Sequence, residues 1–292
     1  MTYPRTVPYG FLGTGFSQGA RVAVLPIPYD STTSYRGGSR EGPSAIIEAS
    51  RNMETWDEYL DMDLSELPVI TLEPLEPVMT GPEAMTEAIY QAAIHQLRQG
   101  HFLVSLGGEH SVTAGLARAH KEYFGDVSFL HFDAHADLRP DYEGTLYSHA
   151  CAGSRMRELG PHNEVGIRSL SREEAAFVKE NNCNIVWARD ILKAKDDSWM
   201  EKALSGLTQN VYVTIDLDVF DPSIMPATGT PEPGGLLYHH VTDLLELLCS
   251  RHKVIGFDVN ELAPIHGIVA PDFMSARLIL RFLGLLVKNG RL

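Results

Sequence analysis

The stretch V-S-F-L-H-F-D-A-H-A-D, residues 127–137, joins an apolar run to three alternating polar residues. In an extended chain every second side chain points to the same face, so Asp133, His135 and Asp137 would project together from the end of a strand. Carboxylates and imidazoles are ligands for divalent cations. The stretch therefore predicts part of a metal site, and a strand end with solvated carboxylates is the alternative.

Another apolar run leads into the segment L-G-G-E-H-S, which contains Glu109 and His110. The two glycines allow a tight backbone turn, which would place His110 at the mouth of the next helix. A histidine alone is as readily a core or capping residue as a metal ligand. Glu109 is expected to point away from a metal and to support its ligands.

Two more strand-like runs end in acidic residues. In V-T-I-D-L-D, Asp216 and Asp218 share one face, and burying two like charges there is costly unless a cation compensates them. In G-F-D-V-N-E-L, Glu261 follows the run and would reach the same crevice. Asp258 lies inside that run and is the weaker candidate.

Two histidines and four aspartates are more ligands than one ion needs, so the pattern favours a two-metal site with bridging carboxylates. The predicted metal ligands are His110, Asp133, His135, Asp137, Asp216 and Asp218. A carboxylate-rich set without thiolate favours Mn²⁺, with Fe, Co, Ni and Zn as candidates. Two ions about 3.5–4 Å apart lower the pKa of a shared water, which predicts hydrolytic chemistry.

The elements that must position these residues alternate between strand and helix along most of the chain. Strands are predicted at residues 21–27, 101–106, 127–132, 164–167, 185–188, 211–215 and 254–257, about eight in all. Helices are predicted at residues 44–52, 83–99, 111–123, 171–181, 199–204, 238–250 and 272–287. This alternation predicts an α/β fold, with helices on both faces of a mostly parallel sheet. Polar clusters follow only some strands, which favours an open sheet over a barrel.

Two parts of the chain lack regular periodicity. Residues 1–20 are rich in proline, glycine and aromatic residues and are expected to form an irregular arm. Residues 56–82 are expected to be a loose acidic segment followed by a proline-dotted connection. We find no linker that would divide residues 21–292, which are predicted to form a single catalytic domain.

The chain has 292 residues and a formal net charge of −14. Such a surface repels phosphate backbones and suits a small cationic substrate, so no nucleic-acid partner is expected. The cysteines, Cys151, Cys183 and Cys249, suggest neither a disulfide framework nor a metal site. Neither a signal peptide nor a run of membrane-spanning length is recognisable, so a cytoplasmic protein without a membrane partner is expected.

The segments G-G-E-H-S, F-D-A-H-A-D and I-D-L-D-x-x-D-P-x-x-x-P-A-T-G-T-P-E-P-G-G resemble the three signature motifs of the arginase/agmatinase (ureohydrolase) family. They occur in family order, and the resemblance runs from about Val22 to the C-terminal helix. It implies a three-layer α/β/α fold with a parallel sheet of about eight strands. It also implies two Mn²⁺ per subunit in a homo-oligomer, either a trimer or a hexamer.

By this resemblance, Asp133 and Asp216 bridge the two ions. His110 and Asp137 complete the ligands of one ion, and His135 and Asp218 complete those of the other. The implied reaction is attack of a metal-bridging hydroxide on a guanidinium carbon, which releases urea and an amine.

Other residues take roles in substrate binding and proton transfer. A carboxylate is the natural bidentate partner of a guanidinium, and Glu261 resembles the family residue in that role. By resemblance Asp137 relays a proton to the leaving amine, and Thr230 orients the substrate. His149 matches a family histidine at the site entrance, where a group that titrates near neutrality suits a proton shuttle, and an exposed loop histidine is the alternative. His131 is interpreted as a hydrogen-bonded strand histidine.

The run D-A-H-A-D-L-R-P-D-Y-E-G-T-L-Y-S-H-A-C resembles agmatinases, and the segments with which arginases hold an amino-acid head group are not recognisable. Asp141 and Glu143 would suit the distal ammonium of agmatine. Residues 152–154, Ala-Gly-Ser, are smaller than expected and would enlarge the pocket or shift specificity.

The sequence thus predicts an agmatinase that converts agmatine to putrescine and urea in polyamine biosynthesis. The nearest alternative is another ureohydrolase, acting on guanidinobutyrate, arginine or a guanidino acid. More distant alternatives are a two-metal phosphohydrolase and a non-catalytic metal-binding subunit.

Overall fold

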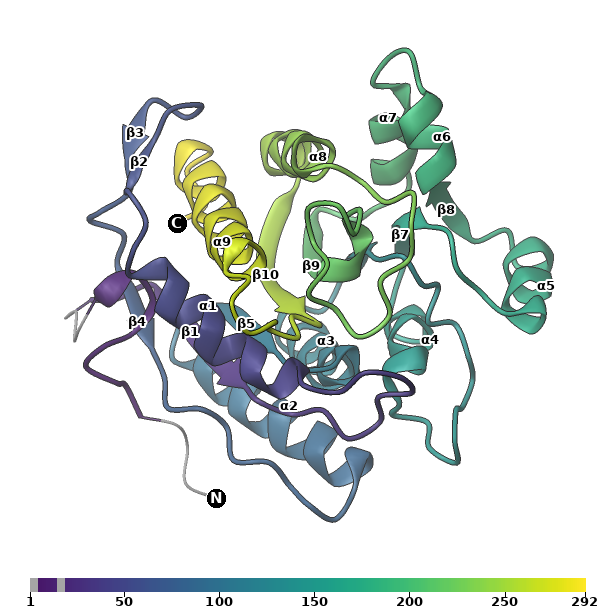
Figure 1. Ribbon diagram of the computed structural model, residues 1–292, viewed down its shortest axis with the longest axis horizontal. Helices are drawn as coiled ribbons and strands as arrows, with labels where there is room; N and C mark the ends of the chain where they lie inside the picture. The colour runs from purple at the N-terminus through teal and green to yellow at the C-terminus, as the bar shows by residue number, and fades with distance from the viewer. Residues whose placement is uncertain (1–4, 15–18) are drawn as a thin grey trace.

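A computed structural model describes residues 5–14 and 19–292 of the chain. Its centre is a sheet of eight strands in the order β4-β1-β5-β10-β9-β6-β7-β8. Every neighbouring pair in this sheet is parallel. The predicted open parallel sheet with helices on both faces is therefore confirmed (Figure 1).

The strands of the sheet are β1 (Val22–Ile27), β4 (Val69–Thr71), β5 (Phe102–Gly107), β6 (Ser128–Phe132), β7 (His162–Ile167), β8 (Asn184–Trp187), β9 (Asn210–Asp216) and β10 (Lys253–Asn260). Seven of them agree with the predicted strands to within a few residues. The prediction that residues 56–82 are irregular was wrong in two places. Strand β4 lies there, and β2 (Trp56–Asp57) pairs antiparallel with β3 (Met62–Asp63).

The helices are α1 (Gly42–Ser50), α2 (Pro82–Arg98), α3 (Thr113–Phe124), α4 (Ala152–Arg157), α5 (Arg172–Glu180), α6 (Ala188–Lys193), α7 (Ser198–Leu204), α8 (Tyr238–Arg251) and α9 (Ala270–Lys288). Short 3₁₀ turns are η1 (Phe11–Gly13), η2 (Ser39–Glu41), η3 (His110–Val112), η4 (His149–Cys151) and η5 (Leu217–Val219). None of the helices in residues 5–14 and 19–292 combines the length and apolar character needed to cross a membrane.

Residues that alternate along a strand pack into two separate apolar layers, one on each face of the sheet. Val22 and Val24 pack in one layer with residues of α1, α8 and α9. Ala23 and Leu25, their neighbours in β1, pack in the other layer with residues of α2 and α3. Each fully buried aliphatic side chain contributes roughly 1.5–3 kcal/mol. The sheet is thus covered on both faces, as parallel sheets require.

Local signals in the sequence set several helix ends. Pro82 stands at the start of α2, where its missing N–H has no intrahelical role. A capping box formed by Ser171 and Glu174 begins α5. The Ser171 hydroxyl accepts the Glu174 N–H at 3.1 Å, and the Glu174 carboxylate accepts the Ser171 N–H at 2.8 Å.

Part of the predicted N-terminal arm lies against the sheet edge. The main-chain N–H of Val7 donates to the Thr71 carbonyl, and that of Phe11 donates to the Thr71 hydroxyl, both at 2.8 Å. Phe11 is fully buried. The arm therefore covers part of β4, while residues 1–4 and 15–18 of the predicted arm lie outside the described residues.

Candidate metal centre and active site

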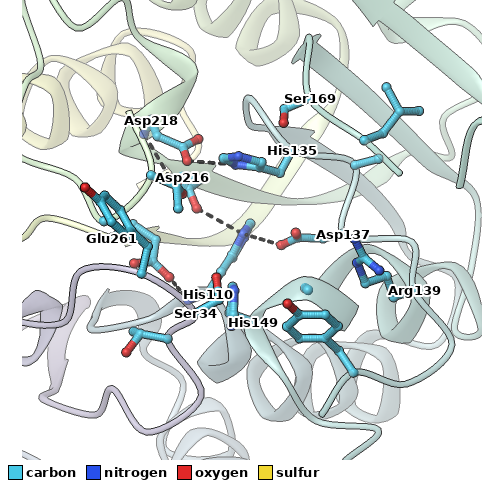
Figure 2. A pocket seen from close by; sticks show the side chains of 18 of the residues that line it. Ser34, His110, His135, Asp137, Arg139, His149, Ser169, Asp216, Asp218 and Glu261 are labelled. Atoms are coloured by element: carbon cyan, nitrogen blue, oxygen red, sulfur yellow. Dashed lines mark hydrogen bonds and ion pairs between the residues drawn. The ribbon is translucent and has the colours of Figure 1, made fainter. Parts of the chain in front are cut away.

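The predicted site residues gather at the carboxyl ends of β5, β10, β9 and β6, four adjacent strands in the middle of the sheet. Except for Asp133, which is fully buried, they line a pocket of about 290 Å³ (Figure 2). Because the strands are parallel, these ends lie at the same edge, where ligands bind in open α/β sheets.

Two glycines let the chain after β5 pass through a very narrow space. A Cβ on Gly107 would stand 1.8 Å from Oδ1 of Asn260, and one on Gly108 would stand 2.0 Å from the carbonyl oxygen of Tyr29. Any other residue would force the loops apart. The glycine pair thus delivers His110 to the centre of the site.

The imidazole of His110 faces three aspartates. Its Nδ1 lies 3.0 Å from Oδ2 of Asp133, 3.2 Å from Oδ2 of Asp137 and 3.3 Å from Oδ2 of Asp216. This buried Nδ1 has no hydrogen bond of acceptable geometry among the described residues. Nε2 pairs with the Thr214 hydroxyl at 2.9 Å, so His110 can present an unprotonated Nδ1 to a metal ion.

The second half of the cluster is built around Asp133, directly after β6. Its Oδ1 accepts the main-chain N–H of His135 at 2.6 Å. Nδ1 of His135 lies 2.9 Å from Oδ2 of Asp218, whose Oδ1 accepts the N–H of Ala134 at 3.0 Å. Asp133, His135 and Asp218 together form one group with metal-ligand spacing, and Asp133 also belongs to a group with His110 and Asp137.

Asp137 and Asp216 complete the set. Asp137 adopts a left-handed backbone with φ of +50°, an uncommon conformation for a residue other than glycine, and one that clusters at functional sites. Asp216 ends β9, and its Oδ1 accepts the N–H of Asp218 at 2.9 Å. The structure therefore brings all six predicted ligands together.

The charges of the cluster fit divalent cations. Burial, together with the charges of Asp218 and Asp133, raises the pKa of Asp216 well above its usual range. Burial and the charge of Asp133 raise the pKa of Asp137. Burial lowers the pKa of His135, but the charges and hydrogen bonds of Asp218 and Asp133 together outweigh burial and raise this pKa to about 12. Two divalent cations would balance four aspartates, and the unpartnered Nδ1 of His110 supplies a lone pair.

Glu261 lies beside this cluster, immediately after β10. Its backbone is left-handed, with φ of +66°, and its N–H donates to the Gly108 carbonyl at 2.8 Å. Its Oε1 accepts the N–H of His110 at 2.6 Å, at the start of a helical segment. Burial and the nearby Glu109 raise the pKa of Glu261 well above its usual range. A bound guanidinium would supply the missing positive charge.

His149, the first residue of η4, lines the pocket near His110 and Ser34 (Figure 2). The Thr32 hydroxyl lies 3.1 Å from its Nδ1 and accepts its main-chain N–H at 2.9 Å. That hydroxyl also donates to Oε1 of Glu109 at 2.9 Å, so its single proton is already used. With its proton on Nδ1, which faces the Thr32 hydroxyl and also the Ser148 hydroxyl at 3.3 Å, His149 keeps Nε2 free to exchange protons in the pocket.

Glu109 therefore supports other residues, as predicted, and does so through the loop after β1. Besides the Thr32 hydroxyl, it accepts the Thr32 N–H at 2.6 Å and the Ser111 hydroxyl at 2.6 Å. Asp258 is buried beneath the site, where the hydroxyls of Thr214 and Tyr212 donate to it. It supports His110 through Thr214 and does not line the pocket.

Thr230, predicted to orient the substrate, lines the pocket, but the distal acidic residues do not. Tyr142 lines the pocket between Asp141 and Glu143, and Asp141 faces a neighbouring cavity. Residues 152–154 begin α4 beneath the Asp137 loop, and the N–H of Ser154 donates to the Asp137 carbonyl at 3.0 Å. They support a metal ligand and do not line this pocket, and Ser154 lines the neighbouring cavity.

Sequence reasoning missed several contributors to the site, among them a loop and a distant arginine. The loop after β1 supplies pocket residues 33–36, although its sequence signals only a glycine-punctuated turn. The arginine is Arg168, and its guanidinium donates to the carbonyls of Gly166, Asp218, Val219, Phe220 and Glu232. It thereby holds the segment that carries Asp218. No local sequence pattern predicts that an arginine side chain will bind backbone carbonyls 50 to 64 positions away in the chain.

An all-parallel α/β sheet with a buried cluster of aspartates and histidines at its carboxyl edge defines a metalloenzyme of the two-ion type. A family model described as the arginase family matches residues 20–284. The chain therefore belongs to the arginase family, which confirms the resemblance of the three motifs.

Individual relatives match along most of their length. The N(1)-aminopropylagmatine ureohydrolase of Synechocystis sp. is 38% identical over 274 residues, covering 91% of this chain and 89% of that protein. The agmatinase of Pyrococcus horikoshii is 34% identical over 264 residues, covering 90% of each. The crystal structure of agmatine ureohydrolase of Thermoplasma volcanium matches with a TM-score of 0.84 and 32% identity, over 92% of this chain and 90% of that one.

Proposed function

We propose that this protein is a manganese-dependent ureohydrolase that converts agmatine to putrescine and urea. The observation that carries the proposal is the position of Glu261, a buried carboxylate that lines the same pocket as the ligand cluster. A guanidinium bound there would lie in the same pocket as the ligand cluster. A pair of divalent cations in such a site supplies a water whose pKa is low enough for it to act as a nucleophile at neutral pH.

Residues of the chain would bind the substrate and transfer the protons of the reaction. Glu261 pairs with the planar guanidinium through charge-assisted hydrogen bonds, and its anchor on the His110 N–H fixes its orientation. Asp137 would accept at its carboxylate the proton that the nucleophilic water gives up and would pass it to the leaving amine as the C–N bond breaks. His149 exchanges protons between the pocket and solvent at Nε2, since Thr32 occupies its Nδ1.

A second candidate substrate is N(1)-aminopropylagmatine, which carries an additional aminopropyl group. Relatives named for that activity are 38% and 39% identical to this chain. A cavity of about 900 Å³ shares Arg139, Ser171 and Glu174 with the pocket, and Asp141 and Glu173 also line it. A longer amine would extend toward these carboxylates.

Urea release after Mn²⁺ loading tests both candidates. The panel contains agmatine, N(1)-aminopropylagmatine, guanidinobutyrate and arginine, each compared by kcat/KM. We expect the highest value for agmatine, and a higher value for its aminopropyl derivative would select the second candidate. Turnover of guanidinobutyrate while agmatine and its aminopropyl derivative are both inert would exclude both candidates, and phosphatase activity without urea would exclude a ureohydrolase.

We further propose a cytoplasmic homo-oligomer, a trimer or a hexamer. The ligand chemistry supports Mn²⁺ because the site offers oxygen and imidazole donors without thiolate. Light scattering of the native assembly tests the oligomeric state, and a monomer would contradict it. Metal analysis of the purified protein tests the assignment of Mn²⁺, and a preparation active only with another metal would contradict that assignment.

A further inference from the structure

Three residues line both the active-site pocket and the neighbouring cavity of about 900 Å³, namely Arg139, Ser171 and Glu174. We call the neighbouring space the second cavity and these three residues the wall. Arg139 lies on the side of the pocket that carries Asp137 (Figure 2). A substrate that extends from the pocket into the second cavity would have to pass the wall.

Two members of the wall are held in place by the main chain. Ser171 and Glu174 form the capping box of α5, in which each side chain accepts the main-chain N–H of the other. The Glu174 carboxylate also accepts the N–H of Leu138 at 3.0 Å, and its side chain is only 6% exposed. Neither residue can leave the wall without breaking these bonds. The side chain that decides whether the two spaces connect is therefore that of Arg139.

The guanidinium of Arg139 is held at the wall by two weak contacts. Its Nε lies 3.8 Å from Oε2 of Glu174, an ion pair too long for a hydrogen bond. Its Cζ lies 4.8 Å from the centre of the Tyr142 ring, within the range of a cation–π contact. The main-chain N–H of Arg139 donates to the Ala150 carbonyl at 3.3 Å, which fixes its backbone. The positive charge of Arg139 thus stands at the wall, between a carboxylate and an aromatic ring.

Tyr142 is a rigid support for this guanidinium. Its N–H donates to the Thr145 carbonyl at 3.0 Å, and the Thr145 N–H donates to the Tyr142 carbonyl at 3.1 Å. The two residues between them, Glu143 and Gly144, have φ of +49° and +84°, which is the pattern of a tight two-residue turn. The Tyr142 ring also meets the His149 ring edge-on, with centroids 6.1 Å apart. Because the ring is fixed in this way, Arg139 keeps its support.

The second cavity beyond the wall suits a cationic arm. Asp141, Glu173 and Glu180 line it and are exposed. Arg155 also lines it, but its guanidinium lies 2.8 Å from the carboxylate of Glu158. Among the three residues of the wall, Arg139 alone is cationic. A positively charged arm that leaves the pocket would therefore meet a like charge before it reached the carboxylates.

We propose that Arg139 determines the length of the substrate by placing a positive charge on the route to the second cavity. This inference rests on the proposed function in taking a guanidino amine as the substrate. N(1)-aminopropylagmatine carries an additional aminopropyl group with a further positive charge, so its arm would bring like charges together at the wall. Arg139 also pairs with Glu174, whose carboxylate would otherwise attract that arm. Agmatine lacks the arm and does not need the passage.

Lysine and methionine at position 139 separate charge from size, because both side chains are unbranched and of similar length. The measured quantity is kcat/KM for N(1)-aminopropylagmatine divided by kcat/KM for agmatine. We expect Arg139→Met to raise this ratio about 10-fold, because the like charge is removed and Glu174 is left unpaired. Arg139→Lys keeps the charge and should keep a ratio close to that of the wild type.

Arg118→Met is the matched control. The Arg118 guanidinium stands 3.8 Å from the centre of the Tyr90 ring and pairs with Glu87 at 2.7 Å, so it repeats the arrangement of Arg139 at a place that lines neither cavity. This variant should leave the ratio unchanged. A rise equal to that of Arg139→Met would overturn the proposal, because the effect would then not depend on the wall.

Urea release is measured on the full chain loaded with Mn²⁺. Circular dichroism and metal analysis confirm that each variant keeps the fold and the metal content of the wild type. Equal ratios in Arg139→Met and Arg139→Lys would overturn the proposal, since charge would then not be the barrier. A wild-type protein that prefers N(1)-aminopropylagmatine would overturn it as well, since the passage would be open with Arg139 in place.

Failure of the barrier and failure of the proposed function give different results. Urea release from agmatine, with the same ratio in Arg139→Met as in the wild type, contradicts the role of Arg139 alone. If the wild type hydrolyses neither compound, the proposed function fails, and calorimetry of the Mn²⁺-loaded protein measures the Kd of each compound directly. A gain in relative affinity for the longer compound in Arg139→Met, but not in Arg139→Lys, would still support the barrier. Equal relative affinities, or no binding of either compound, would overturn it.

Discussion

The main-chain N–H of His110 donates to Oε1 of Glu261 over 2.6 Å, although 151 positions separate the two residues. One short segment thus presents an imidazole to the metal cluster and anchors the carboxylate expected to bind the guanidinium. Metal binding and substrate binding share a backbone support, and a displacement of the G-G-E-H-S segment would disturb both.

Glu261→Gln should impair substrate binding and leave the metal centre intact. The amide oxygen can still accept the His110 N–H, but the neutral side chain loses its charge-assisted pairing with a guanidinium. Such hydrogen bonds contribute about 1.5–3 kcal/mol, so we expect kcat/KM to fall about 10- to 100-fold. Steady-state urea release, combined with metal analysis, measures both effects, and wild-type kinetics would remove Glu261 from the site.

Asp133→Asn should abolish activity together with metal binding. Asp133 lies within both groups of potential ligands, and the change removes a charge that the two ions would share. The amide remains close to the carboxylate in size, so the fold should persist. Metal content after dialysis and circular dichroism provide the measurement. A variant that retains both ions would contradict the predicted bridging role.

Thr32→Val should slow turnover by loosening His149. The valine cannot hold Nδ1 or the main-chain N–H of His149, while Thr32→Ser keeps the hydroxyl that makes these contacts. We expect kcat to fall about 10-fold with little change in KM for valine, and near wild-type values for serine. His149→Ala should keep its metal ions and show a larger loss. Equal kinetics for the valine and serine variants would exclude this positioning role.

Most of the ligand set could be predicted because it obeys local rules. Asp133, His135 and Asp137 alternate after a strand, and parallel strands bring their carboxyl ends to one edge. The contact of Thr32 with Glu109 and His149 joins three distant loops, and no periodicity encodes it. The direction of the Asp141 side chain could not be predicted either, because side chains in an irregular loop do not alternate between two faces. Strand β4 was missed because it has only three residues, Val69–Thr71, which are too few to show the alternation of a strand.

Removal of metal should lower the thermal stability of the protein. A ligand that binds only the folded state stabilises it in proportion to the logarithm of its concentration relative to Kd. Excess EDTA should therefore lower Tm and abolish urea release, and added Mn²⁺ should restore both. Calorimetry with and without the chelator measures the shift. An unchanged Tm in a protein shown to lose its ions would contradict the coupling of metal binding to folding.

The stability of the folded chain should decrease with acid through His120. Burial outweighs the hydrogen bond of its Nδ1 to the Leu116 carbonyl and lowers the pKa of His120 to about 4. Between pH 6.5 and 4 the unfolded chain binds a proton that the folded chain excludes, so the free energy of unfolding falls as pH falls. The full contribution is roughly 3 kcal/mol.

His120→Gln cannot titrate and should show a shallower dependence over this range. Urea unfolding at several pH values measures the slope, with metal-free protein used throughout so that ligand protonation is separated from metal release. Identical slopes for the variant and the wild type would show that other groups dominate acid sensitivity.

The strand order has a consequence for how the protein matures during synthesis. The strands made first form two separate sets, β4-β1-β5 and β6-β7-β8, and the last two strands, β9 and β10, insert between them. A ribosome that has released only the chain up to β8 has therefore produced two half-sheets without a common centre. His110 and Asp133 then belong to different halves, and β9 and β10 must join the halves before the ligands converge. Metal capture would thus mark the completion of folding, and a nascent chain that stalls before residue 210 should not retain Mn²⁺.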